Sequence, residues 1–193
     1  MIIKTVEEGR HFIAVFGLET SRIDLPLLLN DISELSRETG VTIQLFDSSL
    51  LASWEHLFFG ALNALRAFSH CKNISNNLSV ECLLYTSGQR QISVAVKNFG
   101  VKPDSRNIGV ILIGNAQGLL HEVHKKVLLI TKGLENDTVL LINDREKFDS
   151  IRSFFRITET ELSTICDLDE WSSCVEALIK YCIERSSLLI LQK

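Results

Sequence analysis

The stretch that decides the fold covers residues 81–101 and reads ECLLYTSGQRQISVAVKNFGV. We interpret it as two helices that meet at Gly88, because glycine readily supplies the left-handed conformation that ends a helix. The second helix is expected to start at residues 89–91 and to end at Gly100, before Lys102-Pro103. Its apolar residues have the i, i+3, i+4, i+7 spacing of one buried helix face. They are Ile92, Ala95, Val96 and Phe99.

The start of this second helix is a candidate anion-binding site. A helix N-terminus presents unpaired backbone N–H groups and about half a positive charge. Arg90 adds a planar fork of five donors there, and Gln91 adds an amide that can donate and accept. The two side chains could contact a phosphate or the edge of a base. A solvated first turn with no ligand is the alternative interpretation.

The distribution of charge supports a local anion-binding surface. The formal net charge is −4, which disfavours a dedicated nucleic-acid binder. Residues 56–103, however, contain five basic residues and the single acidic residue Glu81, whereas the rest of the chain has 15 basic and 23 acidic residues. A positive block inside an acidic chain fits a small anion-binding surface, and it is also compatible with scatter.

A long helix is predicted from a cap at residues 47–49 to about His70. Its apolar residues keep helical spacing and should form the centre of the core; they are Leu50, Trp54, Leu57, Phe58, Ala61, Leu65 and Phe68. On the other side, His56, Asn63 and His70 follow each other at intervals of seven, with Arg66 beside them. Such a stripe could hold a single-stranded ribonucleotide through its phosphates and 2′-hydroxyls, or it could be an ordinary solvent face.

The remaining pattern predicts an α+β fold, with one domain over residues 1–193 and a mainly antiparallel sheet packed against several helices. Strands are expected at 1–6, 11–18, 41–46, 107–113 and 187–191, and helices at 24–40, 114–131, 144–156, 158–165 and 169–184. The strands cluster at the beginning, middle and end of the chain and do not alternate regularly with the helices, which argues against a doubly wound fold.

The sequence favours a binding protein over an enzyme. It contains no phosphate loop, no dinucleotide fingerprint and no nucleophile elbow, so we expect no catalytic residues and no cofactor. The five cysteines form no CxxC pair and the histidines of His121-Glu-Val-His124 lack zincin spacing, so no metal site is expected. No apolar run is long enough to span a membrane and no signal peptide is evident, so a cytoplasmic protein with reduced thiols is expected.

The ordered run Glu81, Leu83-Leu84-Tyr85, Ser87-Gly88, Arg90-Gln91-Ile92, Ala95 and Phe99-Gly100-Val101 resembles a known family. That family is the kinase-binding subunit of the KEOPS (EKC) tRNA-modification complex, the TPRKB-like proteins of archaea and eukaryotes. The sequence resembles the archaeal type. The helix with Trp54-Glu55-His56-Leu57 and alanines at intervals is similar to the same family. The resemblance is clearest between Trp54 and Gly114.

The resemblance implies a noncatalytic subunit. Such proteins bind the complex's kinase-like ATPase subunit and are linked to the other KEOPS subunits only indirectly. They also hold the 3′ CCA end of tRNA for threonylcarbamoyladenosine modification. Carried onto this chain, tRNA contacts are expected at Arg90, Gln91, Lys97, His56 and Arg66. The kinase contact is expected at an apolar patch that includes Ile92 or Val94, and a homodimer is possible when the partner is absent.

Two other classes of function stay open on the sequence. One is a small-molecule enzyme whose pocket would be lined by His56, His70 and Cys71. The other is a homodimeric structural protein, which solution mass would reveal.

Overall fold

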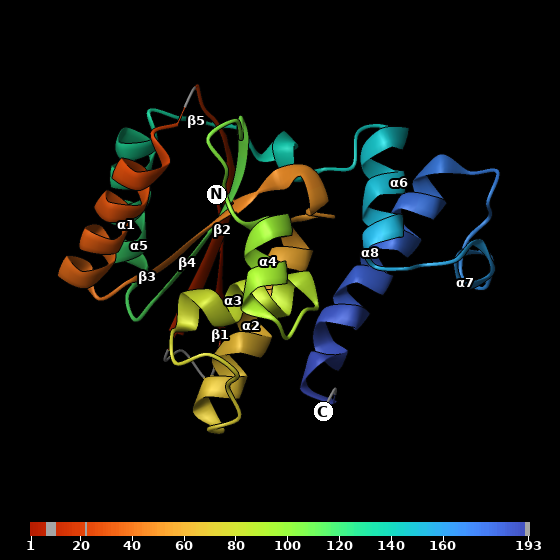
Figure 1. Cartoon of the computed structure of the whole chain (residues 1–193), viewed down its shortest axis with the longest axis horizontal. Helices are drawn as coiled ribbons and strands as arrows, with labels where there is room; N and C mark the ends of the chain where they lie inside the picture. The colour runs from red at the N-terminus through yellow and green to blue at the C-terminus, as the bar shows by residue number, and fades with distance from the viewer. Residues whose placement is uncertain (7–10, 22, 192–193) are drawn as a thin grey trace.

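The computed structural model describes residues 1–6, 11–21 and 23–191, and its centre is an antiparallel sheet. The four longer strands follow the order β1-β2-β4-β3, and the short β5 pairs with the part of the β2 edge that β1 leaves free. The strands are β1 (Ile2–Val6), β2 (His11–Glu19), β3 (Thr42–Asp47), β4 (Asn107–Gly114) and β5 (Leu134–Glu135). Figure 1 shows the sheet between two groups of helices.

The two faces of the sheet carry separate hydrophobic cores. Successive residues of a strand point to opposite faces, so Ile13 and Val15 of β2 enter one core while Ala14 and Phe16 enter the other. Helices α1 (Leu25–Thr39) and α5 (Gln117–Thr131) cover the second face and lie side by side (Figure 1).

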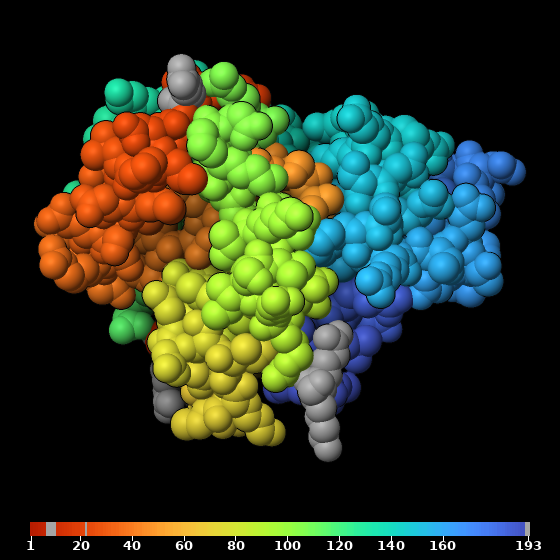
Figure 2. Space-filling view, in the orientation of Figure 1, coloured from red at the N-terminus to blue at the C-terminus, as the bar shows by residue number. Residues whose placement is uncertain are grey.

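The first face carries more helical structure. The helices on this side are α2 (Trp54–Ser69), α3 (Leu78–Ser87), α4 (Ile92–Phe99), α6 (Arg145–Phe154), α7 (Glu159–Ser163) and α8 (Trp171–Leu188). Short 3-10 helices occupy Ser48–Leu50 (η1), Asp137–Leu140 (η2) and Leu189–Leu191 (η3). In Figure 2, α3 and α4 form the middle of the visible surface, and α6, α7 and α8 form a separate projection beside them.

These observations confirm the predicted α+β class and the mainly antiparallel sheet, and they correct two elements. The helix predicted from residues 47–49 begins only at Trp54, because Ser53 accepts from the backbone N–H of His56 (3.2 Å) while Asp47 caps η1. The strand predicted at 187–191 does not form: those residues complete α8 and continue as η3. Leucine and isoleucine suit a helix as well as a strand, so a short apolar run could not distinguish the two.

Helices α2, α3 and α8 meet at one backbone carbonyl, that of Thr86 near the end of α3. His56 Nε2–H of α2 donates to this oxygen (2.8 Å), and the Ser186 hydroxyl of α8 also donates to it (3.4 Å). The Ala52 N–H donates to His56 Nδ1 (3.3 Å), so the two ring nitrogens have complementary partners and the neutral Nε2–H tautomer is fixed. Last-turn carbonyls lack partners inside their own helix, so this one is free to join three helices.

The loop before α3 and the turn after it are held by backbone hydrogen bonds. The Glu81 carboxylate is fully buried and accepts from the N–H groups of Ile74 (2.9 Å) and Ser75 (2.7 Å), which fixes the connection from α2. At the other end, Gly88 adopts φ +61°, as predicted, and its N–H donates to Tyr85 O (3.1 Å). The direction in which the chain enters α4 is therefore set by the end of α3.

We predict that Gly60→Ala destabilises the protein by about 1–3 kcal/mol, because a Cβ at Gly60 would lie 3.1 Å from Thr86 Cα and still closer to the Thr86 hydroxyl. The matched control is Gly118→Ala in the first turn of α5, where a Cβ meets nothing within 4 Å. Helix propensity alone should make that variant slightly more stable, by less than about 1 kcal/mol. Urea unfolding of both variants measures the difference, and equal midpoints would contradict the close packing of α2 on α3.

We predict a pH-dependent loss of stability that depends on His56. Burial lowers the pKa of His56 to about 4, although the hydrogen bond to Thr86 acts in the opposite direction. The unfolded chain therefore binds more protons than the folded one between an unfolded pKa of about 6.5 and pH 4. The histidine imposes no penalty at neutral pH, and as the pH falls through this window the free energy of unfolding should drop by up to about 3 kcal/mol.

Urea unfolding at pH 7, 6, 5 and 4 tests this effect in the native chain, in His56→Gln and in His121→Gln, which removes an exposed histidine. The loss between pH 7 and 4 should be smaller in His56→Gln alone. The same loss in all three proteins would show that the buried imidazole does not control it.

Candidate functional site

The start of α4 leaves two backbone donors open. Gln91 is the N-cap residue, and its side chain makes no capping hydrogen bond. Its carbonyl accepts from the N–H groups of Val94 (3.0 Å) and Ala95 (3.1 Å). Within the described ranges, the N–H groups of Ile92 and Ser93 have no protein acceptor. An eight-residue helix with free amides at its start has donors that can receive an anion, so the anion site expected from the sequence stays a prediction.

The outer surface of α4 exposes apolar side chains. Ala95 and Phe99 are fully buried, but Ile92 is 45% exposed and Val96 is 49% exposed. The prediction that all four share one buried face is therefore wrong for Ile92 and Val96. These two residues are one turn apart, and we call them the α4 stripe. Val94 is half-buried and lies about 160° around the helix from Ile92, so the structure does not bring these two predicted kinase contacts together.

Arg90 lies beside the C-terminal end of α8. Its Nη1 donates to the carbonyl of Leu189 (3.5 Å), so the start of α4 and the end of α8 are neighbours, as Figure 1 also shows. On α2, the Asn63 amide donates to the Ser187 hydroxyl (3.2 Å), and Arg66, one turn further on, is exposed. Arg90, just before α4, and Asn63 of α2 therefore both contact the end of α8. Exposed apolar side chains follow at this end; they are Leu188, Ile190 and Leu191.

The other predicted RNA contacts divide into exposed and buried residues. Gln91 and Lys97 are exposed on α4, with Lys97 one turn after Ser93. His56 is fully buried in the α2–α3–α8 junction, so the predicted surface stripe through His56 is wrong and this side chain cannot reach a ligand. Helical spacing places His56 on the side of α2 that faces away from several of its core residues. The end of α3 packs against that side and buries His56.

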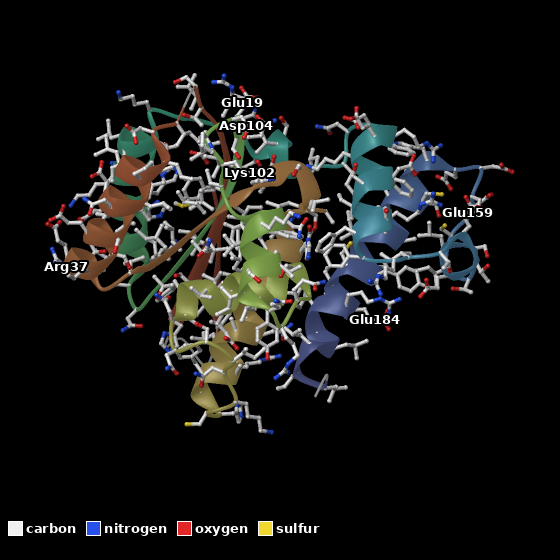
Figure 3. All side chains as sticks on the ribbon, viewed as in Figure 1. Glu19, Arg37, Lys102, Asp104, Glu159 and Glu184 are labelled. Carbon is white, nitrogen blue, oxygen red and sulfur yellow. The ribbon has the colours of Figure 1, made fainter. Side chains whose placement is uncertain are left out.

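The predicted cationic block does not form one continuous surface. Lys102 lies beyond the C-terminal end of α4 together with Asp104, at the top of the view in Figure 3, whereas Arg90 lies at the opposite end of the helix. Lys72 lies in the loop between α2 and α3. The structure thus keeps Arg90 near the end of α8 and separates Lys102 from it.

The enzyme pocket considered on sequence grounds is not assembled. His56 is near the start of α2 and His70 caps its end, so a rise of 1.5 Å per residue separates them by about 21 Å. Among residues 1–6, 11–21 and 23–191, no group of three or more His, Cys, Asp or Glu side chains is arranged to hold a metal ion. No helix in the same ranges is both long and apolar enough to cross a bilayer.

Sequence reasoning missed a polar groove of about 660 Å³ between η1, the loop before β4 and α6. One of its lining residues is Lys147, whose ammonium donates to the carbonyls of Val139 and Leu141 (both 2.9 Å). Burial lowers the pKa of Lys147 to about 8, against the opposing charges of Asp144 and Asp47. Nothing in the sequence pattern marks Lys147, because it looks like any lysine on an amphipathic helix.

Comparison with known proteins identifies relatives of this chain. The family model for kinase binding protein CGI-121 matches residues 28–183. The chain is 31% identical over 119 residues to a regulatory protein Cgi121 from Methanocaldococcus jannaschii, which covers 61% of this chain and 72% of the relative. It is 26% identical over 94 residues to an EKC/KEOPS complex subunit CGI121 from Coccidioides immitis, which covers 49% of this chain and 45% of the relative.

The match to the fungal relative thus spans less than half of that protein's length, whereas the match to the archaeal relative spans more than two thirds of its own. The matched residues 28–183 include α2, α3 and α4 completely, together with most of α8. On these grounds, the chain belongs to the CGI-121 family of kinase binding proteins.

Proposed function

We propose that this chain is a noncatalytic regulatory subunit of a KEOPS/EKC complex that binds the complex's kinase-like ATPase subunit and recruits tRNA through its 3′ CCA end. The α4 stripe is the observation that carries the protein contact, because Ile92 and Val96 are half-exposed on a helix whose core positions are already filled by other residues. The names of the two relatives, a regulatory protein and an EKC/KEOPS complex subunit, support the assignment to such a complex.

The kinase contact would combine the α4 stripe with the apolar end of α8. Arg90 bridges α4 to the Leu189 carbonyl, and exposed Ile190 and Leu191 follow there. Apolar surface that is buried on association contributes about 25 cal/mol per Å², and such contacts at the centre of a patch dominate affinity. A partner that covers this region would remove the cost of leaving these side chains in water.

The tRNA contact would lie next to this patch on the cationic side of α4. Arg90, Gln91, Lys97 and Arg66 are exposed, and the free amides of Ile92 and Ser93 add neutral donors for a phosphate. A small number of cations suits a short single-stranded end better than a long duplex, which would need a wider positive surface. The proposed RNA site therefore contains four of the five predicted residues and omits His56.

The five cysteines are all unpaired and fit a reducing compartment such as the cytoplasm, where such a complex would work. Burial raises the pKa of Cys82 and of Cys182 far above neutral, so neither thiol is poised as a nucleophile. A role in binding accounts for the site better than a reaction does.

We predict that Ile92→Asp combined with Val96→Asp weakens binding to the cognate kinase-like ATPase subunit at least about tenfold, because each carboxylate would be desolvated in the interface. Isothermal titration calorimetry with nuclease-treated proteins measures the affinity without bridging RNA. The matched control is Leu129→Asp on α5, a more exposed leucine on the opposite side of the sheet, and it should bind the kinase normally. Native affinity in the double variant would exclude the α4 stripe from the contact.

We predict that Lys97→Glu weakens tRNA binding and lowers its salt dependence, by about 0.7 in the slope of log K against log salt for each lost phosphate contact. Lys97 makes no ion pair with another described residue, so the substitution leaves the fold intact. Lys125→Glu on α5 changes the net charge equally on the other face and is the control.

Fluorescence anisotropy should be recorded with tRNA and with the same tRNA trimmed of its CCA end. The affinity difference between the two RNAs should shrink in Lys97→Glu and persist in Lys125→Glu. If both variants bind equally, or if trimming has no effect on the native chain, the proposed CCA contact is wrong.

A further inference from the structure

We propose that the groove between α1 and α5 is a second docking surface, and that its occupant is a basic, amphipathic helical segment of another protein. The groove has a volume of about 330 Å³ and lies on the face of the sheet opposite α4. It is separate from the surfaces assigned above to the kinase-like subunit and to tRNA. The proposal therefore goes beyond the proposed function and does not depend on it.

The groove has an apolar floor and an acidic wall. Its apolar lining comes from Leu35 of α1 and from Leu129 and Ile130 of α5. Leu129 is 77% exposed, so no described part of the chain covers most of this side chain. Its charged lining contains three acids against one base; these residues are Asp31, Glu34, Glu38 and Lys126.

The three acids form one continuous row on α1. Asp31, Glu34 and Glu38 are spaced i, i+3 and i+7, so they follow one side of the helix for about 10 Å, or two turns. Leu27, four residues before Asp31 and 57% exposed, extends the same row with an apolar side chain. A partner helix of two to three turns matches this length, and the furrow between two packed helices accepts a third helix by ridges-into-grooves packing.

The acidic charge in the groove is only partly compensated. Glu34 pairs with Arg37 at 3.4 Å, but both side chains are more than half exposed, and Arg37 projects outward near the end of α1 (Figure 3). Within the described parts of the chain, Asp31 and Glu38 have no ion-pair partner, and neither has Lys126. The lining residues carry three acids and one base, a net charge of −2, so the wall has a negative potential that favours lysine and arginine.

The same charge disfavours the other occupants. In a twofold pairing of two copies, each surface meets itself, so two walls of net negative charge would face each other. An anionic membrane surface would be repelled for the same reason. A basic segment with an apolar anchor can bury Leu129 and also pair with the acidic row of α1, and neither alternative does both.

The test uses a synthetic capped helical peptide with leucines at i, i+4 and i+7 flanked by lysine and arginine. The controls are a scrambled peptide of the same composition and a charge-reversed peptide with glutamate at the basic positions. Calorimetry and ¹⁵N chemical-shift mapping on the full chain measure affinity and place the peptide. We expect shifts confined to α1 and α5, weaker binding at higher salt, and no binding of the charge-reversed peptide.

Two variants separate the floor from the wall. Leu129→Ser, and Asp31→Asn combined with Glu38→Gln, should each weaken the peptide at least about tenfold, whereas Ile92→Asp on α4 should leave it unchanged. Kinase binding should show the reverse pattern, so a failure here is distinct from a failure of the proposed function.

Equal binding of the scrambled peptide, shifts outside α1 and α5, or native affinity in Leu129→Ser would overturn the proposal. Sedimentation at increasing concentration supplies a further check. A dimer that Leu129→Ser abolishes would show that a second copy occupies the groove and would also overturn it.

Discussion

The arrangement of this protein depends on the carbonyl oxygen of Thr86, which accepts hydrogen bonds from α2 and α8 at the end of α3. The contact requires a neutral His56 and the absence of a side chain at Gly60, because either a charge or a Cβ would separate α2 from α3. Gly88 then ends α3 two residues later with φ +61°. The start of α4 and the end of α8 are thus positioned by the same short segment, which is why Arg90 can reach Leu189.

The sheet separates two surfaces of different chemistry. On one side, α4 and the end of α8 combine apolar residues with Arg90, Lys97 and Arg66. On the other, the groove of α1 and α5 combines an apolar floor with an acidic row. A net charge of −4 conceals this difference, because it averages over surfaces that a bound partner would meet separately. The local difference in charge between the two surfaces also reduces the chance that one partner binds at the wrong place.

Local signals in the sequence predicted much of the fold, and tertiary burial explains most of what they missed. Gly88 ends α3 through neighbouring backbone, and the caps at Asp144 and Thr158 likewise start α6 and α7 locally, so a single sequence reveals where these helices begin or end. His56 could not be placed, because helical spacing shows which residues share a side and not what packs against that side. The start of α2 was ambiguous because both Asp47 and Ser53 are good caps.

The candidate site was predicted in part for a similar reason. Arg90, Gln91 and Lys97 could be named as candidates because charge and helix position are visible in the sequence, whereas the contact of Arg90 with Leu189 depends on how α8 packs. Around α4, with about 100° per residue, buried Ala95 and Phe99 are followed by Ile92 and Val96 and then by Ser93 and Lys97. These four apolar residues form a band about twice as wide as the part of α4 that the core covers, so in the sequence they looked like one buried face. Only the inner half meets the core, and the outer half separates the core from the cationic side.

A protein bound to the α4 stripe would leave Lys97 accessible, because this residue lies about 100° further around the helix. Both proposed partners can therefore share an eight-residue helix without competing for the same side chains.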